Sequence, residues 1–165
     1  MSRLLSSDVS VLSTASIRVS RSATVPGSPD RFWAVLAEDP SAWGKWCPGF
    51  SETSGWVTPG APGGVGRQRL MHAFGMTFLE TVLEWTPSER FTFAIDECVV
   101  PGLRRFVESW SLRSVEVAGA PATEATWTMA TDTSMPDFIL RRYLAAQQTI
   151  MMAIAKRRLE KLFGD

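Results

Sequence analysis

Polar side chains that could do chemistry lie on the predicted strands and on the last predicted helix. Glu108 shares a strand face with Phe106 and Trp110, in a segment that alternates apolar and polar residues. If this face points into the protein, the Glu108 carboxyl needs a partner or a raised pKa. It would then hydrogen-bond a ligand hydroxyl or act as a general acid or base. The alternative is a carboxylate that reaches solvent or an arginine at the rim of the sheet.

Glu80 offers a second carboxyl, on a strand whose register is ambiguous. Both faces of residues 76–85 mix apolar and polar side chains. Because neighbours on a strand alternate between faces, a shift by one residue would exchange the buried set for the exposed set. The pattern therefore leaves two readings open, a Glu80 that faces inward and a solvated pair of Glu80 with Glu84.

The last predicted helix contributes the other polar candidates. Tyr143, the only tyrosine, lies on its apolar side, where its hydroxyl would face the interior or bond to water as in an ordinary core tyrosine. Gln147 on the same side must be satisfied by a ligand, a water or the sheet. Arg158 would pair with Glu80 or Glu108, or extend its guanidinium to water, which is the reading we favour. Glu80, Glu108 and Tyr143 are candidate catalytic residues, but they form no complete catalytic set.

Other reactive side chains indicate no further site. His72, the only histidine, has no paired serine or cysteine nucleophile, so we interpret it as a surface or packing residue. Cys47 and Cys98 lie far apart without CxxC spacing, which predicts neither a metal site nor a disulfide and suits a reducing cytoplasm. The glycines of residues 58–66 do not stand between a strand and a helix, so they predict no nucleotide site. We expect no metal and no cofactor.

The composition predicts a single soluble domain. The 165 residues carry 17 basic and 17 acidic side chains, and a chain without a basic surplus is not expected to bind nucleic acid. The sequence has no apolar stretch long enough to span a bilayer. We predict a disordered tail over residues 1–14 and one domain over residues 15–165. A monomer and a homodimer both remain open.

The apolar periodicity predicts an α+β domain. Residues 17–25 alternate as a half-buried strand, and Ser28 followed by Pro29 begins a helix. A short second helix carries two tryptophans up to Pro48. The remaining predicted strands and the final helix span residues 50–57, 67–74, 76–85, 91–96, 106–113, 124–130 and 136–163. We expect the sheet to be an antiparallel meander that packs on the apolar side of the last helix.

A set of short motifs suggests a family. They are Val25-Pro26, Pro29, Phe32-Trp33, Trp43, Trp46, Pro48, Val65-Gly66, Glu80, Pro87, Arg90-Phe91, Trp110, Leu112, Thr126, Leu159 and Leu162. Their order over residues 16–163 resembles the START/Bet v 1-like superfamily (SRPBCC), in particular bacterial proteins of the polyketide cyclase/dehydrase type. The resemblance implies a helix-grip fold, in which seven antiparallel strands wrap around the C-terminal helix and two short helices follow the first strand.

The resemblance also implies a cavity between the sheet and the helix, and it favours the reading in which Glu80 faces inward. Members of the superfamily bind lipids, sterols, quinones or polyketides, and some cyclise or dehydrate polyketides. On this basis we expect a ligand site lined by Phe78, Glu80, Phe93, Ile95, Glu108, Trp110, Trp127, Met129, Tyr143, Gln147, Ile150, Met151 and Ile154. The leading hypothesis is binding or carriage of a small hydrophobic molecule. The alternatives are a polyketide cyclase that uses a cavity carboxyl, and an interaction module with a filled core.

Overall fold

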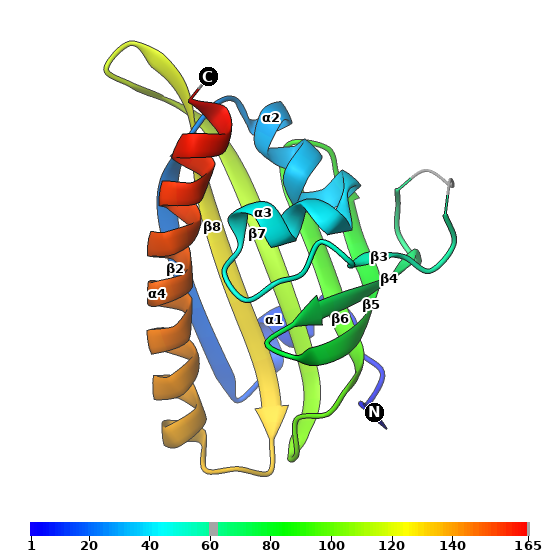
Figure 1. Cartoon of the computed structure of the whole chain (residues 1–165). Helices are drawn as coiled ribbons and strands as arrows, with labels where there is room; N and C mark the ends of the chain where they lie inside the picture. The colour runs from blue at the N-terminus through cyan, green and yellow to red at the C-terminus, as the bar shows by residue number, and fades with distance from the viewer. Residues whose placement is uncertain (60–62, 165) are drawn as a thin grey trace.

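A curved antiparallel sheet wraps around one long C-terminal helix, which confirms the predicted α+β helix-grip architecture (Figure 1). The computed structural model describes residues 1–59 and 63–164. Residues 60–62 of the predicted 58–66 loop, and Asp165, lie outside the described residues. The strands are β1 (Ser2–Arg3), β2 (Ile17–Pro26), β3 (Gly55–Trp56), β4 (Gln68–Ala73), β5 (Met76–Thr86), β6 (Arg90–Cys98), β7 (Leu103–Val117) and β8 (Ala120–Thr133). The sheet runs in the order β2-β8-β7-β6-β5-β4-β3, with β1 paired to β6.

Two tight turns fix the register of the sheet. Phe74 and Gly75 join β4 to β5 with φ angles of 53° and 72°, and Ala118 and Gly119 join β7 to β8 with 51° and 79°. Positive φ at both central residues matches the right-handed twist of the flanking strands. The first turn places Arg69 directly opposite Glu80.

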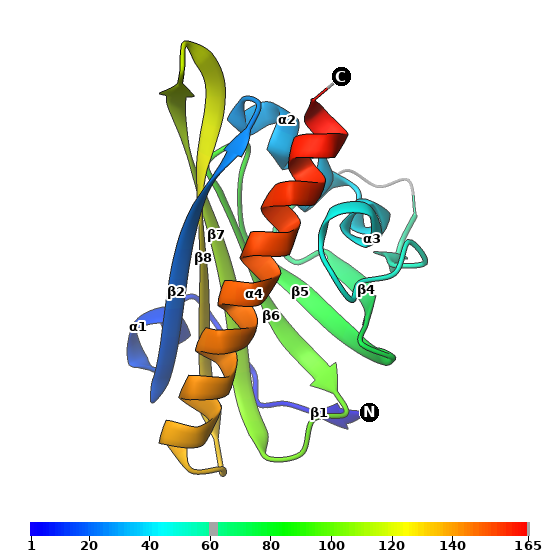
Figure 2. The ribbon, with the colours of Figure 1, turned by 60° about the vertical axis from the view of Figure 1, so that its left-hand side comes forward.

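The long helix α4 (Asp137–Phe163) crosses the concave face of the sheet and packs mainly on β2 (Figure 2). Its buried residues are Leu140, Leu144, Gln148, Met151, Met152, Ala155, Leu159 and Phe163. The predicted apolar side was rotated relative to this one. Ile150 is exposed, Ile154 is only half-buried, and Met152, expected to face outward, is buried. The helix carries apolar residues on most of its circumference, so periodicity alone did not select the side that contacts the sheet.

In the view of Figure 1, short helices cover the upper half of the concave face. They are α2 (Pro29–Trp33), the π-turn η1 (Ala34–Glu38), the 3₁₀ turn η2 (Pro40–Ala42) and α3 (Trp43–Trp46). Ser28 caps α2 as predicted, accepting a hydrogen bond from the Arg31 amide. The indoles of Trp43 and Trp46 donate to the carbonyls of Leu36 and Val35, which fixes these rings over the sheet.

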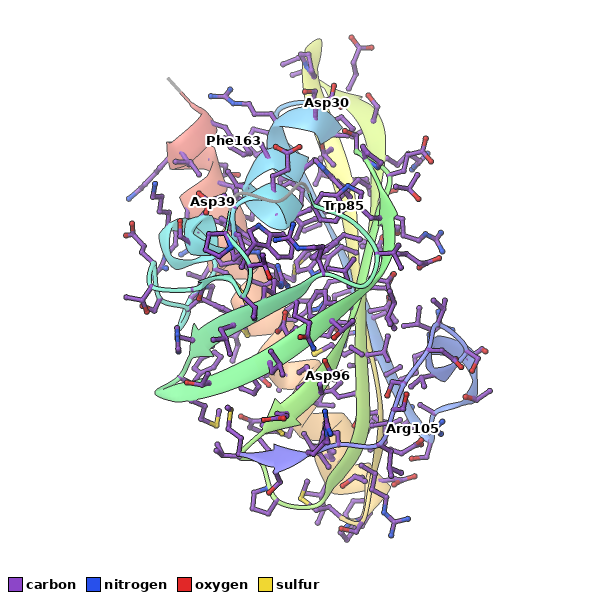
Figure 3. All side chains as sticks on the ribbon, turned by 90° about the vertical axis from the view of Figure 1, so that its right-hand side faces the viewer. Asp30, Asp39, Trp85, Asp96, Arg105 and Phe163 are labelled. Atoms are coloured by element: carbon purple, nitrogen blue, oxygen red, sulfur yellow. The ribbon has the colours of Figure 1, made fainter. Side chains whose placement is uncertain are left out.

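The aromatic core lies under these helices. Trp110 is in edge contact with Phe32, Trp43 and Trp46, at centroid distances of 5.9–6.0 Å. On β5, Trp85 lies close to the short helices (Figure 3). It packs against Trp33 of α2, with their ring centroids 5.0 Å apart. The upper part of the concave face is therefore filled by aromatic rings.

Residues 1–14, predicted to be a disordered tail, include two short elements of the described structure. β1 pairs with the end of β6, and the Leu4 amide donates to the Asp96 carbonyl at 2.7 Å. The short helix α1 (Val11–Thr14) packs on the convex face, where Val11 is buried against Val107 and Ala130. Serines obscured this one apolar anchor in the sequence. Among the described residues, no helix is long and apolar enough to cross a membrane.

Candidate functional site: an apolar cavity beside α4

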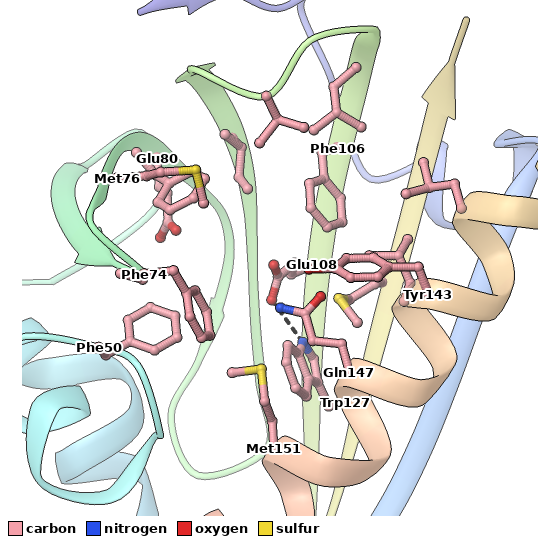
Figure 4. A pocket seen from close by; sticks show the side chains of 18 residues that line it. Phe50, Phe74, Met76, Glu80, Phe106, Glu108, Trp127, Tyr143, Gln147 and Met151 are labelled. Atoms are coloured by element: carbon pink, nitrogen blue, oxygen red, sulfur yellow. Dashed lines mark hydrogen bonds between the residues drawn. The ribbon is translucent and has the colours of Figure 1, made fainter. Parts of the chain in front are cut away.

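The lower half of the concave face is hollow. A cavity of about 170 Å³ lies between α4, the β4–β5 hairpin and the lower ends of β6, β7 and β8 (Figure 4). Its lining is mainly apolar and consists of Phe50, Ala73, Phe74, Met76, Phe78, Glu80, Ile95, Val100, Leu103, Phe106, Glu108, Trp127, Met129, Leu140, Tyr143, Leu144, Gln147 and Met151. Three walls each contribute a methionine: Met76 from β5, Met129 from β8 and Met151 from α4.

Most, but not all, of the residues expected at this site line the cavity. Those that do are Phe78, Glu80, Ile95, Glu108, Trp127, Met129, Tyr143, Gln147 and Met151. Phe93 and Trp110 lie instead in the filled part of the core, against Trp43. Ile150 and Ile154 do not line it, because the helix is rotated away from the predicted side. Tyr143 lies at the mouth and is largely exposed.

Glu108 is one of two carboxyl groups that line the cavity from the sheet. It lies on β7 between Phe93 of β6 and Met129 of β8, and the Trp127 indole Nε1 donates to its Oε2 at 2.7 Å. Trp127 in turn stacks on Trp110, with ring centroids 5.1 Å apart and an interplanar angle of 10°. Figure 4 shows Gln147 extending from α4 toward Glu108 and Trp127 on the sheet.

The environment of Glu108 favours its neutral form. Burial, followed by repulsion from Glu80, raises the pKa of Glu108 to about 8 against the opposing hydrogen bond from Trp127. The Glu108 side chain is half-buried and lines the cavity. At neutral pH this side chain is a carboxylic acid with one O–H to donate.

Glu80 faces the cavity, which resolves the ambiguous register of β5. It is held by Arg69, whose Nε donates to Glu80 Oε2 at 2.7 Å. Burial raises the pKa of Glu80, and the Arg69 charge and hydrogen bond oppose that shift. Arg158, considered above as a partner, is exposed at the end of α4.

Arg69 is the buried charged partner of Glu80 that the sequence reasoning missed. It is completely buried, and its guanidinium lies over the rings of Trp43, Phe91 and Phe93, at 4.4–5.0 Å from their centroids. Within the described part of the chain, its Nη1 and Nη2 atoms make no hydrogen bond. Counting back from the Phe74-Gly75 turn would have found it, since a two-residue loop pairs Arg69 with Glu80.

The other reactive groups stand apart from the cavity wall. His72 Nδ1 lies 3.0 Å from the Thr77 hydroxyl on the β4–β5 hairpin, which fits a packing role. Cys47 and Cys98 are buried free thiols, and burial raises the pKa of Cys47 well above its usual range. In residues 1–59 and 63–164, no three His, Cys, Asp or Glu side chains gather as metal ligands.

The geometry suits one small guest. An apolar cavity of roughly 150 Å³ holds a molecule of the size of benzene, and this cavity is slightly larger. Sites for larger ligands span about 300–1,000 Å³. The flexible side chains of Met76, Met129 and Met151 line the space and can change rotamer, so the cavity can widen for a longer molecule.

Comparison with known protein families gives one match over most of the chain. Residues 16–162 match the family described as polyketide cyclase / dehydrase and lipid transport. The chain belongs to this family. The helix-grip fold and the apolar cavity inside it agree with membership of the polyketide cyclase / dehydrase and lipid transport family.

Solved structures share the fold at low sequence identity. A START superfamily protein from Mycobacterium smegmatis superposes with a TM-score of 0.68 at 15% identity, covering 88% of this chain and 98% of that one. Major latex-like protein 151 from Panax ginseng gives 0.67 at 14% identity, with 87% and 95% covered. The di-domain ARO/CYC BexL from the BE-7585A biosynthetic pathway gives 0.70 at 15% identity, with 87% and 46% covered. Comparison with curated proteins finds no significant match.

Proposed function

We propose that the cavity binds a small, electrically neutral, largely apolar molecule with one carbonyl or hydroxyl group that hydrogen-bonds to Glu108. The observation that carries this proposal is the position of Glu108, a carboxyl group in the wall of a mainly apolar cavity. Burial of the apolar part of the guest supplies affinity, and the Glu108 O–H, with the Gln147 amide beside it, selects the orientation.

The charge of the lining supports a neutral guest. Two carboxyl groups, Glu80 and Glu108, line the cavity, and among the described lining residues there is no lysine or arginine. The nearest buried cation, Arg69, pairs with Glu80 and is enclosed by aromatic rings. A carboxylate guest would enter without a counter-ion, and an unpaired buried charge is strongly unfavourable.

Three guests with the same ring test the proposal. We expect acetophenone to bind roughly 3–10-fold more tightly than ethylbenzene, because it adds one hydrogen bond worth about 0.5–1.5 kcal/mol. We expect benzoate to bind at least about tenfold more weakly than acetophenone because of its charge. Titrations followed by ¹H–¹⁵N NMR measure the three affinities, and benzoate binding as tightly as acetophenone would refute the preference for neutral guests.

Variants link the binding to the cavity. Leu144→Trp and, independently, Met151→Trp fill the cavity from α4 and should abolish acetophenone binding. Val117→Trp, at an exposed position near the β7–β8 turn, is the matched control and should bind normally. Glu108→Leu should remove the advantage of acetophenone over ethylbenzene, whereas Glu108→Gln, which still donates, should keep it.

The same carboxyl favours a second candidate function, cyclisation or dehydration of a poly-β-keto chain. A protonated acid with a pKa of about 8 is suited to donate a proton near neutral pH. With a poly-β-keto thioester as substrate, Glu108→Gln should reduce turnover by roughly 10²–10⁴-fold if Glu108 is the general acid. If Glu108→Gln converts the thioester at the same slow rate as the unmodified protein, Glu108 is not a general acid. Carriage would then be the function of the site.

A further inference from the structure

Helix α4 carries a second apolar stripe, which faces away from the sheet. Ile139, Tyr143 and Ile150 fall on one side of the helix at 100° per residue, and the exposed Ala146 lies between them. The opposite side of α4 already packs on the sheet. A helix that is apolar on both sides has one side without a partner in the monomer.

Two exposed apolar residues of other elements line the cavity or lie next in sequence to a residue that does. Phe74 lies at the tip of the β4–β5 hairpin and lines the cavity together with Tyr143. Val99 immediately precedes Val100, which lines the cavity from the β6–β7 connection. We call Phe74, Val99, Ile139, Tyr143 and Ile150 the rim patch, and each of them is between 48% and 61% exposed.

The backbone at Phe74 adds a second observation. Its φ of 53° lies in the left-handed region, where glycine or asparagine is favoured and a bulky side chain is rare. The ring does contact Phe50, at a centroid distance of 6.2 Å, yet half of it remains exposed. A large aromatic residue therefore occupies an exposed turn position where a small polar one would be more stable.

The charge of α4 indicates what covers the rim patch. The helix has six basic and two acidic side chains, a surplus of four positive charges on a chain whose net charge is zero. Arg142, Lys156, Arg157 and Lys161 are exposed along it. A second copy of the chain meeting this face through a two-fold axis would oppose like charges. An anionic surface would attract them.

We infer that the rim patch docks on an anionic lipid bilayer, with the cavity mouth toward the membrane. Ile139, Tyr143 and Ile150 would enter the boundary between headgroups and acyl chains, as the apolar side of an interfacial helix does. The flanking arginines and lysines would contact the phosphates, since anionic leaflets attract basic segments. Phe74 and Val99 would insert from the other sides of the mouth, so that an apolar guest passes between bilayer and cavity without crossing water.

Vesicle flotation tests this inference on the full chain. We expect binding to mixed phosphatidylcholine/phosphatidylglycerol vesicles, weakened by added salt, and little binding to phosphatidylcholine alone. Ile139→Asp/Ile150→Asp should lower the partition coefficient by at least about tenfold, because two apolar insertions become charged. Arg142→Glu/Arg157→Glu should lower it by a similar factor through repulsion. Val117→Asp, at an equally exposed apolar position on the β7–β8 hairpin, should leave it unchanged.

The controls separate docking from the proposed ligand binding. Acetophenone affinity in solution should be the same in Ile139→Asp/Ile150→Asp as in the unmodified protein, since neither side chain lines the cavity. Equal flotation of that variant and the unmodified protein would overturn the inference. So would light scattering that shows a dimer which these two substitutions dissociate, because the patch would then bind a second copy.

Discussion

Replacing Arg69 with methionine is expected to lower the free energy of unfolding by about 3–5 kcal/mol, the cost typical of removing one partner from a buried ion pair. Glu80 would keep its buried position on β5 without the guanidinium that now donates to it at 2.7 Å. The rings of Trp43, Phe91 and Phe93 would also lose their contact with the cation. Urea denaturation followed by tryptophan fluorescence measures the change.

Two companion variants show whether the loss comes from the unpaired carboxyl. Arg69→Met/Glu80→Met should recover most of the lost stability, because apolar residues of similar volume often replace a buried pair without cost. Arg113→Met breaks another cross-strand pair, with Glu124 on the exposed β7–β8 surface, and should cost less than about 1 kcal/mol. The interpretation fails if Arg69→Met costs no more than Arg113→Met.

The unmodified protein is expected to lose stability as the pH rises from about 4.5 to 8. Over this range Glu108 is ionised in the unfolded chain but still protonated in the folded one, so unfolding releases a proton and becomes easier at higher pH. The shift in pKa from 4.5 to about 8 sets an upper bound of about 5 kcal/mol. Because the Glu108 side chain is only half-buried, we expect a loss of about 2–4 kcal/mol.

Glu108→Gln isolates this contribution, because the amide keeps the shape and still accepts from Trp127 Nε1. Its free energy of unfolding should vary less with pH, and it should exceed that of the unmodified protein at pH values near and above 8. Denaturation curves at several pH values compare the two proteins. Parallel pH profiles would mean that Glu108 titrates normally and that the cavity does not hold it neutral.

From β2 to α4, the order of the main elements was readable from the sequence because they have local signals. Ser28-Pro29 begins α2, alternation marks the long strands, and Gly164 follows the end of α4. The Arg69–Glu80 pair was equally accessible through the turn at Phe74-Gly75, since a two-residue turn determines every pairing behind it. The alternation within a single strand does not reveal this pair, because its two residues lie on different strands.

The boundary between filled core and cavity was not readable. Phe93 and Ile95 have the same pattern on β6, yet Phe93 lies under Trp43 while Ile95 lines the cavity. That difference depends on where α3 ends above the sheet, and the sequence pattern of β6 does not contain this tertiary packing. The rotation of α4 was hidden for a related reason, since a helix apolar on two sides gives no single preferred side. In residues 1–14, the buried Val11 anchors α1 on the sheet. One valine among several serines is too weak a pattern to predict that contact.

The three methionines in the cavity walls give each wall its own spectroscopic label. Met76 reports on the hairpin, Met129 on the rigid sheet and Met151 on the long helix. With ¹³C-labelled methyl groups, one spectrum of these residues would show whether a guest enters by displacing the hairpin, the helix or neither. The native methionines therefore allow ligand entry into the cavity to be followed by NMR without adding a probe.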